Sequence, residues 1–530
     1  MNFLIELTYD ADIRKSFDKN ILSQIFITFT QKRNEKFSFP HFFRRRIQYR
    51  TFAFAVAADH FHLRVHPFHS SILSTAMAGE KQESFKILMF PWLAHGHIFP
   101  YLQLSKNLIA THNFTIYLCS TAVNLHHLSK HAAASLHLVE LHMPYPPELP
   151  PHLHTTKNLP SHLIPTLINA FQESIPSFTQ TLQTLTPDLV IFDIFQPWAP
   201  KIASSMGIPS VYFSTSGVSS ISYFHHIHTY GTNAGFPFPA LSLPESEISL
   251  MGNRARPNFK DADDDYPFGN YRISTDFALV KSSRYVEEKY VDYLSTLCKK
   301  KIVCTGPLIA PDDADEDVGF DKSEIMEWLN KKELGSTIYT NFGSECFLSK
   351  EQIGEIAKGL LLVKDVNFLW VVRFPFEETE RKVEEEMPVG FLEAVGERGL
   401  VVTGWAAQRR ILGHPSVGGF VSHCGRSSVT ESLYYGVPVV AMAMNVEQPL
   451  NAQWMVELGV GVKVERGAGG GVYVGEEIGR AIEKVMVVEK EGLRSRARSL
   501  SEVMREKEGE EVREVGSSLL DICVKNKKMT

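Results

Sequence analysis

The chain has 530 residues, of which 44% are hydrophobic and 22% are charged, and its formal net charge is −6 at pH 7. This composition suits a globular protein of two sizeable domains, and the acidic balance gives no electrostatic reason to expect nucleic acid or anionic membrane as a partner. No stretch approaches about 18 uninterrupted apolar residues, so no transmembrane helix is predicted. The six cysteines are scattered, which favours reduced thiols in a cytoplasmic protein over a disulfide framework.

The first 76 residues differ in composition from the rest. They carry eleven Lys and Arg against six Asp and Glu, and they contain many Phe without an obvious helical or strand period. One interpretation is an organelle transit peptide, although such peptides are usually poor in acidic residues. The interpretation we favour is an upstream extension, because the sequence from Met77 onward reads as a natural start. Either way, we expect little regular structure in residues 1–83.

Residues 84–306 alternate short apolar strands with helices, which predicts a first domain built on a parallel sheet. His97 follows the strand at 86–90, Asp193 closes a later strand, and Thr215 stands at the end of the next one. Because the carboxyl ends of parallel strands meet at one edge of the sheet, Asp193 could reach His97. The alternatives are structural: a lone histidine is often part of the packing, and Asp193 could cap a helix.

A segment rich in Pro and Asp, residues 307–324, lacks periodicity and predicts a linker between domains. Residues 325–530 then predict a second domain of the same kind, which opens with a strand and a Gly-Ser loop ending at Ser344. The expected fold class is therefore α/β, with two Rossmann-like domains facing each other across a cleft. The loop at 144–163 is rich in His but lacks the spacing of metal ligands, so no metal site is predicted.

The most informative stretch is residues 405–448, WAAQRRILGHPSVGGFVSHCGRSSVTESLYYGVPVVAMAMNVEQ. Its pattern predicts a buried strand, a tight glycine loop, a helix and another strand. A glycine loop between a strand and a helix exposes backbone N–H groups at the positive end of the helix dipole, where a phosphate can bind. Ser427 and Ser428 add hydroxyl donors there, and Glu447 and Gln448 stand at the end of the next strand.

This stretch resembles the plant secondary-product box of family 1 UDP-dependent glycosyltransferases. The residues that carry the resemblance are Trp405, Gln408, His414, Gly419, Phe420, His423, Cys424, Gly425, Ser428, Glu431, Gly436, Pro438, Gln448, Asn451 and Ala452. Two positions depart from the usual HCGWNS: Arg426 replaces Trp, and Ser427 replaces Asn. The resemblance extends over about residues 84–520 and implies the GT-B fold. Other segments resemble the branch of the family that extends the sugars of existing glycosides.

The resemblance implies a role for each site residue. His97 would be the base that deprotonates the acceptor hydroxyl, and Asp193 would be its partner. The remaining residues would hold the UDP-sugar: Ser344, His423, Ser427 and Ser428 the diphosphate, Trp405 the uracil, Gln408 and Glu431 the uridine, Glu447 and Gln448 the sugar, and Thr215 the donor from the opposite domain. Ala406 would also belong to this donor site. The reaction would invert the anomeric centre without a metal or other cofactor. The enzyme would be a cytoplasmic monomer whose partners are a UDP-sugar and a small-molecule acceptor.

Arg426 leaves the donor sugar open between two alternatives. If its guanidinium turns outward or pairs with an acid elsewhere, the donor is UDP-glucose, which Gln448 also favours. If it forks onto a sugar carboxylate, the donor is UDP-glucuronic acid. Two further alternatives are a catalytically inactive UDP-sugar-binding protein and a nucleotide-dependent oxidoreductase. The second is disfavoured because no GxGxxG follows a first strand.

Overall fold

The computed structural model describes residues 3–9, 61–67 and 84–529, except 158, 233, 245–246, 249–264, 310–321, 344–345, 375–381, 405, 445–446 and 468–470. The chain divides into two compact units, Met1–Glu83 and Ser84–Thr530. In the first unit, strand β1 (Phe3–Tyr9) pairs antiparallel with β2 (Phe61–Pro67). Here the expectation of no strand period is wrong, because Phe61, Leu63 and Val65 alternate with polar residues.

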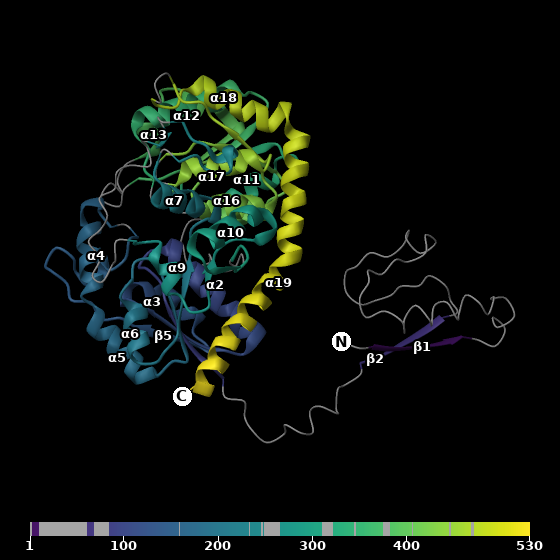
Figure 1. Cartoon of the computed structure of the whole chain (residues 1–530). Helices are drawn as coiled ribbons and strands as arrows, with labels where there is room; N and C mark the ends of the chain where they lie inside the picture. Colours follow the sequence, from purple (N-terminus) through teal and green to yellow (C-terminus); the bar gives the residue numbers. More distant parts are fainter. Residues whose placement is uncertain are drawn as a thin grey trace. The chain divides into compact units, whose positions relative to one another are not determined.

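The second unit contains two separate parallel sheets (Figure 1). The first is seven-stranded, in the order β5-β4-β3-β6-β7-β8-β9. Its strands are β3 (Lys86–Phe90), β4 (Thr115–Ser120), β5 (Leu136–Glu140), β6 (Leu189–Phe192), β7 (Ser210–Ser214), β8 (Phe277–Val280) and β9 (Lys301–Cys304). The central strands are buried along their whole length because helices cover both faces of the sheet.

Helices connect the strands of the first sheet in the right order for repeated βα units. They are α2 (His95–His112), α3 (Ala122–Leu128), α4 (Ile164–Gln172), α5 (Ile175–Leu185), α6 (Ala199–Ser205), α7 (Val218–Tyr230), α9 (Gly269–Ile273) and α10 (Arg284–Cys298). Short 3-10 turns lie at η3 (Ser129–His131), η4 (Pro151–Leu153), η5 (Ser161–Leu163) and η6 (Pro239–Leu241).

The second sheet is six-stranded, in the order β12-β11-β10-β13-β14-β15, and is also parallel throughout. Its strands are β10 (Thr337–Asn341), β11 (Asn367–Val372), β12 (Gly399–Thr403), β13 (Val417–Ser422), β14 (Val439–Ala441) and β15 (Gly461–Lys463). Its helices are α11 (Lys322–Asn330), α12 (Lys350–Leu362), α13 (Val383–Glu386), α14 (Phe391–Val395), α15 (Gln408–Leu412), α16 (Arg426–Tyr435), α17 (Gln448–Glu457) and α18 (Gly475–Glu483), with a 3-10 turn at η9 (Gly396–Arg398) and a π-helical segment at η11 (Lys484–Val488).

Each sheet has a topological switch point beside its first strand. In the first sheet β3 lies between β4 and β6, and Phe90 is in register with Phe192. In the second sheet β10 lies between β11 and β13, and Asn341 is in register with Ser422. The loops that leave these strands diverge to opposite faces, which opens a crevice where α/β folds bind ligands. This topology places the residues that follow β3, β6, β10 and β13 where chemistry is expected.

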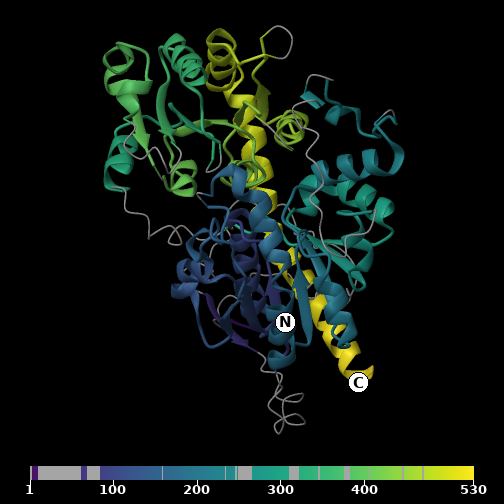
Figure 2. The same cartoon turned by 90° about the vertical axis from the view of Figure 1, so that its left-hand side faces the viewer.

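The last helix, α19 (Lys490–Met529), joins the two sheets of the second unit. Figure 1 and Figure 2 show it running from the part built on the second sheet to the part built on the first. Near its start, Arg494 Nε donates to the Gly418 carbonyl at 3.1 Å. Near its end, Val515, Leu519 and Ile522 belong to the core beneath the first sheet. The C-terminal end of the predicted second domain, residues 325–530, therefore packs against the first sheet.

Among the described residues, no helix combines the length and the apolar character needed to cross a membrane.

Candidate active site

His97 and Asp193 meet at the switch point of the first sheet. Asp193 directly follows β6, and His97 lies in the first turn of α2. His97 Nδ1 is 2.8 Å from Asp193 Oδ2, and the carboxylate has no exposed surface. The backbone N–H of Trp92 donates to Oδ2 at 3.0 Å, and that of Ile194 donates to Oδ1 at 2.6 Å. These bonds fix the carboxylate, and through it the imidazole ring.

The hydrogen bonds of His97 determine which ring nitrogen can take up a proton. A carboxylate oxygen only accepts, so Nδ1 must carry the hydrogen that is directed at Asp193. Thr215 Oγ1 also lies 3.1 Å from Nδ1, which places Thr215 beside this pair. In the neutral imidazole the lone pair is then on Nε2, and the His97 side chain is 21% exposed. The arrangement is that of a general base held by an acid partner.

At the switch point of the second sheet, polar side chains are linked into one chain. Gln408, at the start of α15, donates through Nε2 to Glu431 Oε2 at 2.7 Å and to Ser428 Oγ at 3.3 Å. Asn341, at the end of β10, donates to Gln408 Oε1 at 2.9 Å. The structure thus brings together Gln408, Ser428 and Glu431, three of the residues expected to hold the UDP-sugar.

His423 stands at the start of the glycine loop and packs against glycine. A Cβ added to Gly343 would come within 2.7 Å of the His423 ring, and one added to Gly425 within 2.5 Å. Gly343 also has a φ of 79°, which only glycine adopts readily. Burial lowers the pKa of His423 to about 4, so the ring is neutral near pH 7. Its Nδ1 is buried and bonds to none of the described residues.

The other expected donor-binding residues lie around the same loops. Gln448 begins α17 and accepts the backbone N–H of Met444 at 2.9 Å, and Glu447 precedes it. The carbonyl of Ala406 accepts the N–H of Gln408 at 2.8 Å. Ser344 and Trp405 lie outside the described residues.

Arg426 points away from solvent and pairs with an acid of the first domain. Its Nη2 is 2.5 Å from Glu287 Oε2, and its Nη1 is 3.3 Å from Glu287 Oε1. The two side chains are 7% and 0% exposed. The guanidinium also lies 4.7 Å from the centre of the Trp454 ring. Of the alternatives for Arg426, the structure shows pairing with an acid elsewhere, but in a buried site rather than an outward position.

Neighbouring residues hold the Arg426–Glu287 pair through further hydrogen bonds and leave space for the guanidinium. Glu287 also accepts the Ser219 N–H at 2.9 Å and the Ser282 hydroxyl at 2.5 Å. Burial would raise the pKa of Glu287, but Arg426 and these hydrogen bonds hold it below its usual value. Gly217 gives the guanidinium room, because a Cβ there would lie 2.5 Å from Arg426 Nη1.

Two residues of this region were missed by the sequence analysis. Glu287 lies in the charged helix α10, 139 residues from Arg426, and nothing in the local sequence distinguishes it from the exposed acids of that helix. Lys281 directly follows β8, and its Nζ donates to Ser427 Oγ at 3.3 Å. The rule that selected Asp193, a polar residue at the carboxyl end of a buried strand, applies equally to Lys281.

Within the described residues, no group of three or more His, Cys, Asp or Glu side chains is arranged to hold a metal ion.

Comparison with known proteins places this geometry in a family. A family model described as UDP-glucoronosyl and UDP-glucosyl transferase matches residues 333–506. Mogroside IIIx synthase of Siraitia grosvenorii is 43% identical over 456 residues, which cover 84% of this chain and 99% of that protein. Beta-D-glucosyl crocetin beta-1,6-glucosyltransferase of Gardenia jasminoides is 44% identical over 443 residues, which cover 82% and 98% of the two chains.

A solved structure shows the same fold. The crystal structure of Glycyrrhiza uralensis UGT73P12, complexed with glycyrrhetinic acid 3-O-monoglucuronide, matches with a TM-score of 0.71 and 24% identity over 84% of this chain and 98% of that one. The predicted GT-B architecture of two parallel α/β domains is therefore confirmed. Because the two plant relatives are matched along nearly their whole length, the chain belongs to the UDP-glucoronosyl and UDP-glucosyl transferase family and is a UDP-glycosyltransferase.

Proposed function

We propose that this enzyme transfers glucose from UDP-glucose to a hydroxyl on the sugar of an existing plant glycoside, with inversion at the anomeric carbon. The observation that carries the mechanism is the 2.8 Å contact between His97 Nδ1 and Asp193 Oδ2. This contact leaves His97 Nε2 available as a proton acceptor at the switch point of the first sheet. The name of the Gardenia glucosyltransferase supports the choice of glucose and of a glycosylated acceptor.

The proposed reaction is a single displacement. His97 Nε2 takes the proton of the acceptor hydroxyl while its oxygen attacks the anomeric carbon of the donor. The bond from that carbon to the diphosphate breaks, and UDP leaves with the electron pair. Asp193 stabilises the imidazolium that forms, because its buried carboxylate lies against the protonated Nδ1. Attack from the face opposite to the leaving group inverts an α-linked donor to a β-glycoside.

The donor proposal depends on Arg426. A guanidinium recognises a carboxylate with two parallel N–H donors, and both terminal nitrogens of Arg426 already face Glu287. Recruiting Arg426 to glucuronate would leave Glu287 as an unpaired charge in a site with no exposed surface, which is unfavourable. The Arg426–Glu287 pair therefore favours a neutral hexose over glucuronic acid.

The acceptor proposal rests on the relatives. The name of the Gardenia enzyme states that it adds glucose to glucosyl crocetin through a 1,6-linkage, and the Siraitia enzyme is named for a mogroside product. We therefore expect acceptors that already carry glucose. The new sugar is added to the hydroxyl of that glucose that lies next to His97 Nε2.

The test is a matrix of donors and acceptors read by mass spectrometry. UDP-glucose and UDP-glucuronic acid are each offered with glycosides and with the matching aglycones, and the anomeric configuration of the product is read by NMR. We expect a hexose to be added to the glycosides with a β-linkage. Products formed only on aglycones would overturn the acceptor proposal, and a preference for UDP-glucuronic acid would overturn the donor proposal.

Three further features are part of the proposal. The reaction uses no metal, because backbone N–H groups and the N-terminus of α16 supply positive charge to the diphosphate. The enzyme works in the cytoplasm, which its six free cysteines support. It acts as a monomer.

A further inference from the structure

We propose that Lys281, which belongs to the first domain, binds the diphosphate of the UDP-sugar held by the second domain. The inference rests on the proposed position of the donor at the N-terminus of α16. It adds to that site a cationic side chain from the opposite domain, so that both halves of the protein hold the donor.

The position of Lys281 is fixed by its strand. Lys281 directly follows β8, and its backbone N–H donates to the Ser214 carbonyl at 2.9 Å, which extends the ladder between β8 and β7 by one residue. The residue is only 5% exposed. Its Nζ reaches across to Ser427 Oγ, the second residue of α16, at 3.3 Å. The ammonium group therefore lies at the end of the helix where the sequence predicts the diphosphate.

The charges around Lys281 leave room for an anion. Among the described residues Lys281 forms no ion pair, although Glu431, Arg426 and Arg409 lie near enough to affect it. Glu431 already accepts a hydrogen bond from Gln408, and the charge of Arg426 is balanced by Glu287. The N-terminus of α16 adds the partial positive charge of the helix dipole. The N-terminus of α16 thus lies beside a buried ammonium group that is paired with no carboxylate of the described residues.

The titration of Lys281 fits the same picture. Burial lowers its pKa to about 8, aided by Arg426 and Arg409 and opposed by Glu431. A buried ammonium with one hydroxyl acceptor has unused N–H donors, which is unfavourable unless an anion binds. A diphosphate at Ser427 would supply acceptor oxygens and negative charge, and it would raise the pKa again. Binding of UDP should therefore be accompanied by proton uptake near pH 8.

The alternative is that Lys281 only tethers the domains through its bond to Ser427. The two roles differ in what happens when the charge is removed. A tether contributes to the folded state whether or not UDP is present. If Lys281 instead binds the diphosphate, it stabilises only the complex with UDP. In the protein without UDP, burying its charge is unfavourable, so replacing Lys281 by an apolar residue should be tolerated.

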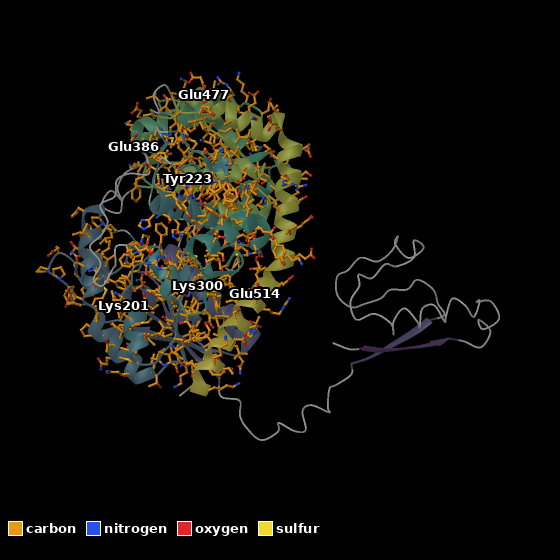
Figure 3. All side chains as sticks on the ribbon, in the orientation of Figure 1. Lys201, Tyr223, Lys300, Glu386, Glu477 and Glu514 are labelled. Atoms are coloured by element: carbon orange, nitrogen blue, oxygen red, sulfur yellow. The ribbon has the colours of Figure 1, made fainter. Side chains whose placement is uncertain are left out.

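The experiment compares Lys281→Met with a matched control, Lys201→Met. Lys201 is an exposed lysine on α6 of the first domain and is labelled in Figure 3. UDP is titrated into each purified full-length protein by calorimetry at pH 7. Loss of a charge-assisted hydrogen bond is worth about 1.5–3 kcal/mol, so Lys281→Met should bind UDP roughly 10- to 150-fold more weakly. Lys201→Met should bind like the parent, and both variants should keep the melting temperature of the UDP-free parent.

A second measurement follows the proton. At pH 8 the parent should take up about half a proton on binding UDP, measured by repeating the titration in buffers of different ionisation enthalpy. Lys281→Met should take up none. UDP itself adds little, because the second pKa of a phosphate group is about 6.

The outcomes are separable. If Lys281→Met binds UDP within twofold of the parent, or lowers the melting temperature without changing UDP affinity, Lys281 is a tether and the inference is wrong. If the parent itself does not bind UDP, the proposed donor site fails instead.

Discussion

Replacing Glu287 by Gln should destabilise the protein strongly, because it leaves the buried Arg426 cation without a carboxylate partner. The Arg426 side chain is 7% exposed, and Glu287 is the carboxylate that both of its terminal nitrogens contact. Removing one member of a buried ion pair typically costs about 3–5 kcal/mol, whereas replacing both by uncharged groups is often neutral. We therefore expect a loss of about 3–5 kcal/mol for Glu287→Gln and less than about 1 kcal/mol for the double variant with Arg426→Met.

The partner variant in this cycle, Arg426→Met, should respond differently to pH. Without the guanidinium, burial is left to raise the pKa of Glu287 above its unfolded value. The folded protein then binds a proton more tightly than the unfolded chain, so stability is retained at low pH and lost as pH rises through the raised pKa. Arg426→Met should therefore be less destabilised at pH 5 than at pH 8.

Urea unfolding of the four proteins in this cycle, followed by tryptophan fluorescence, gives the coupling energy directly. Glu514→Gln is the matched control, because its ion pair with Lys301 is exposed on both sides and should be worth less than about 1 kcal/mol. Glu514 is labelled in Figure 3. Additive effects in the cycle, or a loss for Glu287→Gln as small as that of the control, would refute the account of a buried pair.

Other expectations concern the base, the N-terminal segment and a buried acid. His97→Ala should lower kcat by about 10²–10⁴ while UDP affinity stays within a few-fold, and Asp193→Asn should cost less; near-normal turnover of His97→Ala would contradict the mechanism. A chain that starts at Met77 should keep the melting temperature and turnover of the full chain, and a fall in either would show that residues 1–76 matter. Burial raises the pKa of Glu511 from its usual value of 4.5 to about 7, so the protein loses stability as the pH rises between these two values. Glu511→Gln should add up to about 3 kcal/mol of stability at pH 8 and little at pH 5, and equal shifts in melting temperature at both would contradict this.

The sequence predicts those parts of the site that depend on strand ends. His97 and Asp193 are found from a simple rule, since each follows a buried strand and such ends share one edge of a parallel sheet. Their separation of 96 residues does not matter, because the order of β3 and β6 in the sheet brings them together. The glycine loop is found in the same way, from a strand, a turn and a helix in succession.

The partners of Arg426 could not be predicted in this way. The chain contains 60 Asp and Glu residues, and pairing one of them with Arg426 requires the packing of one domain on the other. Sequence periodicity reports which face of a helix is buried but not which surface buries it. The end of α19 illustrates this, because Val515, Leu519 and Ile522 recur at helical spacing, yet only the structure shows that they pack beneath the first sheet.

Both residues that depart from the family's motif contact side chains of the first domain. Arg426 is neutralised by Glu287, and Ser427 meets Lys281. These two partners are linked by Ser282, which follows Lys281 in sequence and donates its hydroxyl to Glu287. The proposed donor site is therefore completed by the end of β8 and the start of α10, and it coincides with the contact between the domains.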